Sequence, residues 1–293
     1  MPKELIVTQE IASAPSRTDD AHKGDVGRVA VIGGCAGEVM MVGAPSLAAA
    51  AALRGGAGLV QLFVPDRIRE AVGVITPCAT VRRLPNDAGG IVAALAAFEA
   101  DVVAMGPGLG DSLAPDMVAG VIAGFAGPMV LDADALNLLA SIPSFDIPNP
   151  ARIVLTPHTG EAKRLLASRR MDKNIESGAP SRRVAACTLA ELFGTSVVLK
   201  GRGTIVTNGE RIYTNHTGNA GMATGGTGDV LTGLIAALIG QRMQPFEAAI
   251  LGVYLHGLAG DFAAEELGRL SLTALDLIDY LPEAFAEHES AAD

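Results

Sequence analysis

A run of glycines, one acid and an apolar stretch follow one another in residues 218–240, which have the sequence GNAGMATGGTGDVLTGLIAALIG. The segment 225-GGTGD-229 comes immediately before the apolar residues, whose pattern predicts a helix over 227–239. Backbone N–H groups at a helix N-terminus attract an anion, and glycines let a phosphate come close to them. The sequence therefore predicts an anion hole. Its candidate residues are Gly225, Gly226, Thr227 and Gly228.

The acid of this run, Asp229, falls in the first turn of the predicted helix. At that place a carboxylate could accept the proton of a hydroxyl that attacks phosphorus, which is the work of a general base in phosphoryl transfer. An acid in a first helical turn can also do no more than favour the start of the helix. The glycines and the acid together favour phosphoryl-transfer chemistry over a purely structural role.

Strands and helices alternate along the rest of the chain. Apolar runs predict buried strands at 28–34, 58–65, 101–106, 128–134, 152–157 and 196–201. Helical patterns, the first of them ending in glycines, lie at 43–58, 112–124, 159–167, 181–193, 227–239, 245–265 and 273–287. Such alternation is typical of a mainly parallel sheet with helices on both faces, so we predict an α/β fold.

Three further segments complete the predicted organisation. Residues 203–215 predict a tight hairpin, because Asn208-Gly209 stands between two short runs of β type. Residues 168–180 are polar and predict a surface loop. The chain shows no solenoid repeat and no low-complexity linker. We therefore expect one domain over residues 1–293, in which residues 1–20 form a flexible or peripheral segment.

Polar residues follow several of the predicted strands, at the carboxyl ends where open α/β sheets bind their ligands. His158 follows the strand at 152–157 and could be a turn residue, a helix cap or a ligand contact. Glu161 could be an ordinary first-turn acid, or could order water around Mg²⁺. The same two interpretations stay open for Asp132 and Asp134.

Two polar residues lie on the largely apolar helix predicted at 245–265. His256 is interpreted as a core histidine whose ring is hydrogen-bonded within the protein. Asp261 could face the same cleft as Asp229, or solvent, and the sequence leaves both open.

Composition restricts the class of protein. The chain has 293 residues, 49% of them hydrophobic, which is ample for a sizeable core. Its formal net charge of −10 argues against a nucleic-acid partner.

The start of the chain lacks the apolar core of a signal peptide, and the apolar run at 41–53 is too short to span a bilayer. We expect a cytoplasmic location, no membrane partner and reduced thiols at Cys35, Cys78 and Cys187, which lack metal or C-x-x-C spacing.

Two common nucleotide-binding motifs are absent. No G-x-x-x-x-G-K-[ST] P-loop occurs anywhere in the chain. The turn 106-GPGLG-110 departs from the dinucleotide fingerprint, and no matching acid is placed on a second strand of that unit. A dehydrogenase of the Rossmann type is therefore disfavoured.

Six motifs in this order resemble a known family, the ADP-dependent NAD(P)H-hydrate dehydratases. They are 23-KGDVGRVAVIGG-34, 106-GPGLG-110, 131-LDADALN-137, 155-LTPHTGE-161, 198-VLKGRGT-204 and 216-HTGNAGMATGGTGDVLTG-233. The resemblance covers roughly residues 20–285. It implies the ribokinase-like fold, a three-layer α/β/α sandwich around a mainly parallel sheet.

The resemblance also implies a reaction. Such enzymes restore NADH and NADPH from their S-epimeric hydrates, NADHX and NADPHX, with ADP or ATP as phosphoryl donor and Mg²⁺ as cofactor; with ADP the products include AMP. Phosphorylation converts the 6-hydroxyl into a good leaving group, and the ring nitrogen then expels phosphate. A homotetramer is implied, for which the alanine-rich helix at 44–53 is a candidate interface. The resemblance further implies functional pairing with a separate NAD(P)H-hydrate epimerase.

Roles for individual residues follow from the matched motifs. Asp229 would contact the hydrate and act as base on its 6-hydroxyl, and Gly228 would touch the AMP part as well as the anion. Positions that line the hydrate pocket in the family are matched by Ala44, Gly108 and His158. The nucleotide-binding K-G-x-x-T is matched by Lys200, Gly201, Arg202, Gly203 and Thr204.

The sequence departs from the family pattern next to the expected metal site. Glu161 falls where ribokinase relatives carry the acid of a magnesium-associated N-x-x-E motif, but His158 replaces the asparagine. The departure weakens the expectation that Glu161 acts on Mg²⁺, and any such role would be indirect.

Two other functions remain open. A small-molecule kinase of the same fold, acting on a vitamin-like alcohol, would share G-x-G-D, but the T-P-H-x-G-E and G-N-x-G-M-A-x-G-G runs favour the dehydratase. A nucleotide sensor without turnover would not need Asp229 together with Lys200 and Thr204. The sequence leaves open the preference for ADP or ATP, and for NADHX or NADPHX.

Overall fold

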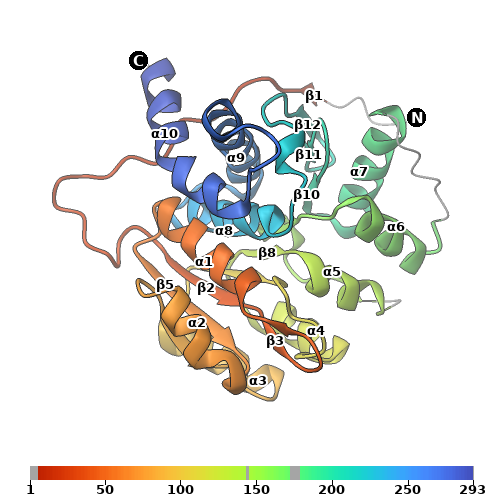
Figure 1. Cartoon of the computed structure of the whole chain (residues 1–293). Helices are drawn as coiled ribbons and strands as arrows, with labels where there is room; N and C mark the ends of the chain where they lie inside the picture. Colours follow the sequence, from red (N-terminus) through yellow and green to blue (C-terminus); the bar gives the residue numbers. More distant parts are fainter. Residues whose placement is uncertain (1–5, 143–144, 172–178, 293) are drawn as a thin grey trace.

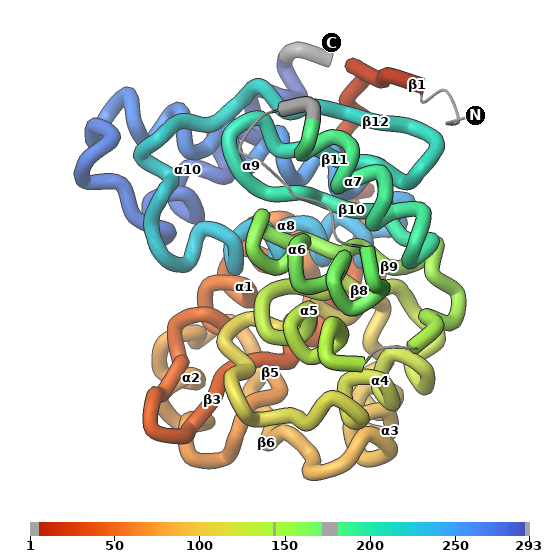
Figure 2. The backbone as a smooth tube through the Cα atoms, turned by 90° about the vertical axis from the view of Figure 1, so that its right-hand side faces the viewer, coloured from red at the N-terminus to blue at the C-terminus, as the bar shows by residue number. Residues whose placement is uncertain are grey.

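The structure is a computed structural model that describes residues 6–142, 145–171 and 179–292. Its main sheet contains ten strands in the order β1-β12-β11-β10-β9-β8-β7-β2-β5-β6 (Figures 1 and 2). Neighbouring strands are parallel except where β11 pairs with β10 and with β12. The strands are β1 (Ile6–Val7), β2 (Arg28–Ile32), β5 (Leu59–Val64), β6 (Thr80–Arg83), β7 (Val102–Met105), β8 (Met129–Leu131), β9 (Ile153–Leu155), β10 (Ser196–Leu199), β11 (Ile205–Thr207) and β12 (Arg211–Thr214).

Helices cover both faces of this sheet (Figure 1). One layer contains α1 (Gly43–Arg54), α8 (Thr227–Gly240), α9 (Pro245–Leu267) and α10 (Ala274–Ala292). The other contains α3 (Ala88–Phe98), α4 (Pro115–Gly124), α5 (Ala133–Ala140), α6 (Thr159–Ser168) and α7 (Ala179–Phe193). The predicted three-layer α/β/α sandwich is confirmed. None of the helices in the described ranges is both long and apolar enough to cross a membrane.

Two hydrophobic cores lie on opposite faces of the sheet, and alternate residues of the central strand β2 enter each. Val29 and Val31 belong to the core that includes buried residues of α1, α8, α9 and α10. Ala30 and Ile32 belong to the core that includes buried residues of α3 to α7. Successive side chains of a strand point to opposite faces, so a strand buried on both sides is apolar throughout.

The predicted strands and helices form close to the expected places. The hairpin of β11 and β12 turns at Asn208-Gly209, as predicted. No elements were predicted between 66 and 100, where α2 (Arg69–Ile75), β6 and α3 lie. The small hairpin of β3 (Cys35–Ala36) and β4 (Met40–Met41) was not predicted either. Most of the predicted loop at 168–180 lies outside the described residues.

The described part of the N-terminal segment runs along the surface. Residues Ile6–Val7 form β1, which extends the sheet beside β12. Farther on, His288 of α10 is hydrogen-bonded through Nε2 to the carbonyl oxygen of Ala12, at 3.0 Å. The pairing of β1 with β12 and the hydrogen bond between His288 and Ala12 therefore hold this segment against the domain.

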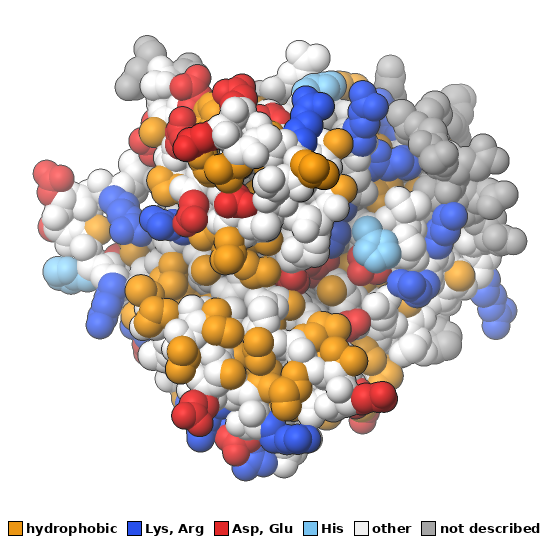
Figure 3. All heavy atoms as spheres, viewed as in Figure 1, with side chains coloured by type: hydrophobic (Ala, Val, Ile, Leu, Met, Phe, Trp, Pro, Cys, Tyr) orange, Lys and Arg blue, Asp and Glu red, His pale blue; other side chains and the backbone are white. Residues whose placement is uncertain are grey.

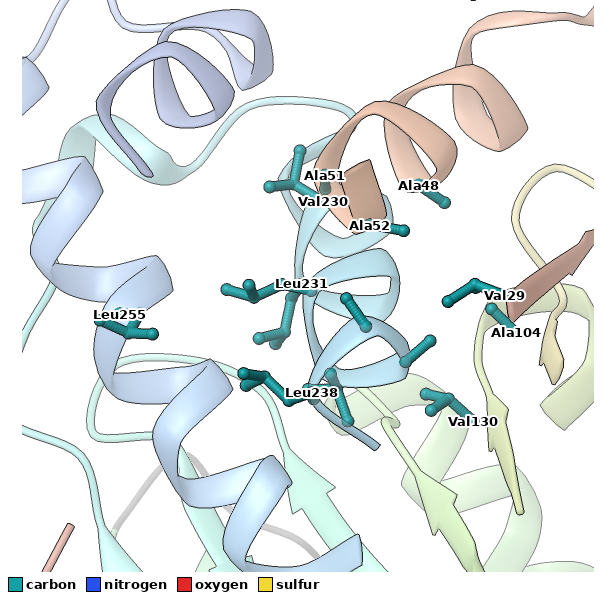
Figure 4. Close-up of a cluster of buried hydrophobic side chains, with 14 of the residues drawn as sticks. Val29, Ala48, Ala51, Ala52, Ala104, Val130, Val230, Leu231, Leu238 and Leu255 are labelled. Atoms are coloured by element: carbon teal, nitrogen blue, oxygen red, sulfur yellow. The ribbon is translucent and has the colours of Figure 1, made fainter. Parts of the chain in front are cut away.

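Helix α8 occupies the centre of one helical layer, and its residues from Val230 to Gly240 are buried (Figure 4). A helix that is apolar all round must be enclosed by other elements, as the sequence of α8 indicates. Helix α1 packs against it through Ala48, Ala51 and Ala52, which are inaccessible to solvent. These alanines of the suggested interface helix therefore serve the chain's own core and are unavailable to a partner.

Gly233 allows α1 and α8 to approach closely. A Cβ there would lie 1.9 Å from the carbonyl oxygen of Ala48, on the backbone of the neighbouring helix. The contact involves main-chain atoms, so no side-chain rotation could relieve it.

We therefore expect Gly233→Ala to lower the free energy of unfolding by about 1–3 kcal/mol, the usual cost of overpacking, although alanine is the better helix former. Chemical denaturation measures this. Gly43→Ala is the matched control, since Gly43 begins α1 and a Cβ there meets nothing within 4 Å. Equal stability of the two variants would show that the helices are not in close backbone contact.

Candidate active site

A buried ion pair joins two strand ends beneath the start of α8. Lys200 follows β10 and places Nζ 2.5 Å from Oδ1 of Asp132, which follows β8. The second oxygen of Asp132 accepts a hydrogen bond from Oγ1 of Thr232 on α8, at 2.7 Å. Asp132 is only 1% exposed, so its negative charge depends on these two donors.

Gly228 brings the backbone of α8 close to this ion pair. A Cβ at Gly228 would lie 3.3 Å from Nζ of Lys200 and 3.9 Å from Oδ2 of Asp132. The first turn of α8 therefore stands directly over the ammonium group. A positive side chain and the positive end of a helix dipole act together at this point, which favours an anion.

The glycines before α8 leave its N-terminus open. Gly226 is the residue before the helix and has a φ of 94°, and a Cβ there would lie 2.5 Å from Cδ1 of Leu47. Gly225 has open space around it. No side chain caps the helix, and the first N–H groups of a helix have no acceptor within it. This geometry supports the predicted anion hole at 225–228.

Asp229 lies beside the same charges, in the first turn of α8. Burial, and then the negative charge of Asp132, raise the pKa of Asp229 to about 7, while Lys200 opposes the shift and Asp134 adds to it. A carboxyl group with a pKa near neutrality can both take up and release a proton at physiological pH. The position and the pKa suit a general base next to an anion hole.

Lys200 keeps its positive charge although it is buried. Burial by itself would lower the pKa of Lys200, but Asp132, Glu161 and Asp229 together raise it above its ordinary value. The ammonium group therefore remains a fixed cation at the floor of the site. Lys200 is predicted from the family resemblance to bind the nucleotide, and its Nζ lies beside Gly228 at the start of α8.

His158 and Glu161 form a reciprocal cap at the start of α6. Nδ1 of His158 accepts hydrogen bonds from the N–H groups of Gly160 and Glu161, at 2.9 and 3.4 Å. Oε2 of Glu161 accepts from the N–H of His158 at 2.8 Å, and Oε1 lies 3.2 Å from Nε2 of that ring. The helix-cap interpretation of His158 is therefore confirmed. Its side chain is still 53% exposed, so it can also contact a ligand.

The charge of Glu161 is linked to the ion pair. Burial raises the pKa of Glu161, the positive charge of Lys200 lowers it, and Asp132 raises it again. Glu161 is 4% exposed. A buried acid of this kind belongs to the same electrostatic group as Asp132 and Asp229.

The turn after β7 approaches α1 and the β3–β4 hairpin. A Cβ at Gly108 would lie 3.0 Å from Cβ of both Ala44 and Met41, so Gly108 and Ala44 are brought together as the predicted hydrate pocket requires. Asp134 holds this turn, because its Oδ2 accepts from the N–H of Gly110 at 2.8 Å. Exposed apolar side chains occur on the hairpin, and such side chains gather on the lower half of the face in Figure 3.

Arg182 on α7 supports the segment 200–204, and sequence reasoning missed it. Its guanidinium donates to the carbonyl oxygens of Leu199 and Lys200, at 3.1 and 3.2 Å, and to that of Arg202. Burial lowers the pKa of Arg182. The sequence showed only an arginine in the helix predicted at 181–193, and an arginine on a helix is usually exposed to solvent.

His256 and Asp261, the two polar residues of α9 singled out from the sequence, are hydrogen-bonded to segments of the site. Nε2 of His256 lies 2.9 Å from the carbonyl oxygen of Thr227, and burial lowers the pKa of His256 to about 4, so the ring is neutral and donates this bond. Asp261 accepts from the N–H of Gly218 at 2.7 Å and from Nδ2 of Asn219 at 2.9 Å. The hydrogen-bonded histidine is confirmed, and Asp261 faces the glycine loop.

The acids do not form a ready-made metal cage. Within the described ranges, no three His, Cys, Asp or Glu side chains are arranged to hold a metal ion. The oxygens of Asp132 face Lys200 and Thr232, and those of Glu161 face His158. The carboxylates therefore stabilise the protein's own cations and N–H groups.

A ribokinase-like fold in which an uncapped helix N-terminus, a buried lysine and an acid meet is typical of phosphoryl-transferring α/β proteins. A family model described as NAD(P)H-hydrate dehydratase matches residues 29–283. The chain therefore belongs to the NAD(P)H-hydrate dehydratase family.

Individual relatives agree with this assignment. An ADP-dependent (S)-NAD(P)H-hydrate dehydratase of Neisseria meningitidis is 40% identical over 86% of this chain and 82% of its own. The bifunctional NAD(P)H-hydrate repair enzyme Nnr of Moorella thermoacetica is 38% identical over 96% of this chain, which spans 56% of that protein. A solved ADP/ATP-dependent NAD(P)H-hydrate dehydratase of Bacillus subtilis, co-crystallised with ATP and Mg²⁺, superposes with a TM-score of 0.75 at 27% identity, covering 94% of this chain and 95% of that chain.

The electrostatic surroundings of Asp229 predict its titration. We expect a midpoint near pH 7 for the Asp229 carboxyl group, followed by ¹³C NMR of aspartate-labelled protein and assigned with Asp229→Asn. In Lys200→Met the midpoint should rise further, because Lys200 lowers the pKa of Asp229. A midpoint near 3.8, the ordinary pKa of an aspartate, in the wild-type protein would show that the carboxyl group is well solvated.

Proposed function

We propose that this protein is an ADP-dependent NAD(P)H-hydrate dehydratase that converts the S-epimers of NADHX and NADPHX back to NADH and NADPH. The observation that carries the proposal is Asp229, with a pKa of about 7, in the first turn of α8 beside the open N–H groups at 225–228. Family membership supplies the substrate class. The dehydratase of Neisseria meningitidis supports ADP as donor and the S-epimer as substrate.

The proposed reaction begins as a phosphoryl transfer. Asp229 accepts the proton of the 6-hydroxyl, whose oxygen attacks the β-phosphorus of ADP, and AMP leaves. The N–H groups of Gly225 to Gly228 bind the phosphoryl oxygens, and the ammonium of Lys200 beneath them balances their charge. The role of the base requires the ionised form, which predominates above about pH 7.

Elimination completes the dehydration. The lone pair of the ring nitrogen forms a double bond to C6 while the bond from C6 to the phosphate oxygen breaks and phosphate departs. Loss of a proton from C5 then restores the dihydronicotinamide ring. Phosphate is a far better leaving group than hydroxide, which explains why a dehydration takes place in a kinase-like site.

The hydrate and the nucleotide would lie on two sides of the start of α8. The hydrate would lie against Ala44, Gly108 and His158, next to Asp229. The nucleotide would lie along Lys200, Gly201, Arg202, Gly203 and Thr204, a segment that Arg182 supports through the carbonyl oxygens of Leu199, Lys200 and Arg202. Gly228, next to the ammonium of Lys200, would touch the AMP part.

Mg²⁺ belongs to the proposal as a companion of the nucleotide. The carboxylates of the site are engaged with protein donors, so the phosphates and water would supply most of the ligands, as Mg²⁺ commonly requires. Glu161 would act on the ion only through water. The solved Bacillus subtilis relative was co-crystallised with ATP and Mg²⁺, which supports the pairing of metal and nucleotide.

The cellular setting completes the proposal. The three cysteines are free thiols, which fits a cytoplasmic enzyme. Relatives that carry out both repair steps in one chain support pairing with an epimerase. Because the chain resembles this family, we also propose that it forms a homotetramer.

The proposed activity predicts recovery of absorbance at 340 nm when purified protein and Mg²⁺ meet hydrated NADH and ADP. Parallel reactions with ATP, and with NADPHX, measure the preferences for donor and substrate. Asp229→Asn should reduce the rate at least a hundredfold, within the range of general-base contributions, and leave ADP binding intact because backbone groups form the anion hole. No recovery with either nucleotide, together with phosphorylation of a thiazole alcohol, would establish a small-molecule kinase instead.

A further inference from the structure

A cavity opens at the carboxyl edge of the sheet, next to the proposed hydrate pocket. Its volume is about 400 Å³. Pro65 follows β5, and Leu84 to Asn86 follow β6, so the cavity lies off the ends of these two strands. Figure 2 places β5 and β6 at the end of the molecule opposite β10 to β12. The roles assigned so far leave this cavity unused.

The cavity adjoins the hydrate pocket through one short turn and one hairpin. Asp111 and Ser112 line it and directly follow the turn that contains Gly108. Gly37 lines it from the hairpin, and a Cβ there would lie 3.2 Å from Oδ2 of Asp111. The same hairpin places Met41 against Gly108. One continuous wall therefore connects the two compartments.

The distance between the compartments suits a dinucleotide. Asp132, at the end of β8, lies by the reaction centre, and β7, β2 and β5 follow it in the sheet before β6. Neighbouring strands are about 4.8 Å apart, so β5 and β6 lie roughly 14 and 19 Å from β8. An extended dinucleotide with its nicotinamide at Asp229 would carry its adenosine half over this interval.

The lining of the cavity combines apolar and polar groups. Leu84, Met117 and Ala36 offer an apolar surface to a base. Arg83 is exposed at the cavity and, among the described residues, has no carboxylate or hydrogen-bond partner. Asp111 can accept from a ribose hydroxyl. A site with an apolar floor, a free cation and an acceptor is suited to a nucleoside phosphate.

We propose that this cavity binds the adenosine half of the dinucleotide hydrate, with Leu84 and Met117 against the base and Arg83 facing a phosphate. The proposal rests on the proposed function, since it extends the same substrate from Asp229 to a second compartment. It makes Arg83 a specificity residue for dinucleotides over mononucleotides, remote from the bonds that change.

Two variants test the cavity without touching the reaction centre. Arg83→Gln removes the cation, and Asn86→Trp fills the cavity from an exposed position. Arg83→Gln should lower kcat/KM for hydrated NADPH about tenfold, the usual effect of losing one charge-assisted hydrogen bond. Asn86→Trp should also lower it, because the indole occupies the space of the base, and neither variant should change the KM for ADP. Arg82→Gln is the matched control, because Arg82 precedes Arg83 on β6 and points to the opposite face of the strand.

A truncated substrate separates this proposal from its premise. Hydrated reduced nicotinamide mononucleotide keeps the reacting ring and lacks the adenosine half. We expect Arg83→Gln, Asn86→Trp and the wild-type protein to dehydrate it at equal rates. Equal losses on both substrates, or no loss on the dinucleotide, would overturn the cavity proposal while leaving the dehydratase in place. No turnover of either substrate by the wild-type protein would overturn the proposed function and this inference with it.

Discussion

The ammonium of Lys200 and the carboxylate of Asp132 form an ion pair, 2.5 Å apart, where β8 and β10 end beneath α8. Removing one partner of a buried pair typically costs about 3–5 kcal/mol, because the other charge is left unpaired. Thr232 extends the pair into α8. The ion pair therefore connects the ends of β8 and β10 with α8, the helix that carries the proposed catalytic groups.

The same ion pair shapes the chemistry above it. Asp132 raises the pKa of Asp229, and Lys200 limits the rise, so the carboxyl group reaches about 7 instead of remaining protonated at physiological pH. Gly228 lets the helix stand close over the ammonium group. A base, a fixed cation and open N–H groups then meet at one point. That combination lets a hydroxyl be deprotonated where the phosphoryl group it attacks is stabilised.

Much of the fold could be predicted because buried parallel strands and their helices leave strong apolar patterns, as in β2 and α8. The glycine run and Asp229 were recognisable because helix-terminal anion sites depend on local sequence. The partners of Asp132 could not be predicted, since Lys200 and Thr232 are 68 and 100 residues away. The role of Arg182 and the particular partners of His256 and Asp261 were equally hidden, because they are carbonyl and N–H groups brought near by the tertiary fold. The missed β3–β4 hairpin has two-residue strands, too short for a periodic pattern.

In the proposed mechanism, a kinase-like site removes a hydroxyl group by first phosphorylating it. An isotope experiment tests this directly: NADH is hydrated in ¹⁸O-labelled water, purified, and treated with the protein, ADP and Mg²⁺ in unlabelled water. Mass spectrometry then locates the oxygen of the 6-hydroxyl. If the hydroxyl group is phosphorylated first, the label appears in the released inorganic phosphate, because the bond between C6 and oxygen breaks after the oxygen has bonded to phosphorus. Label recovered in water, with unlabelled phosphate, would contradict it.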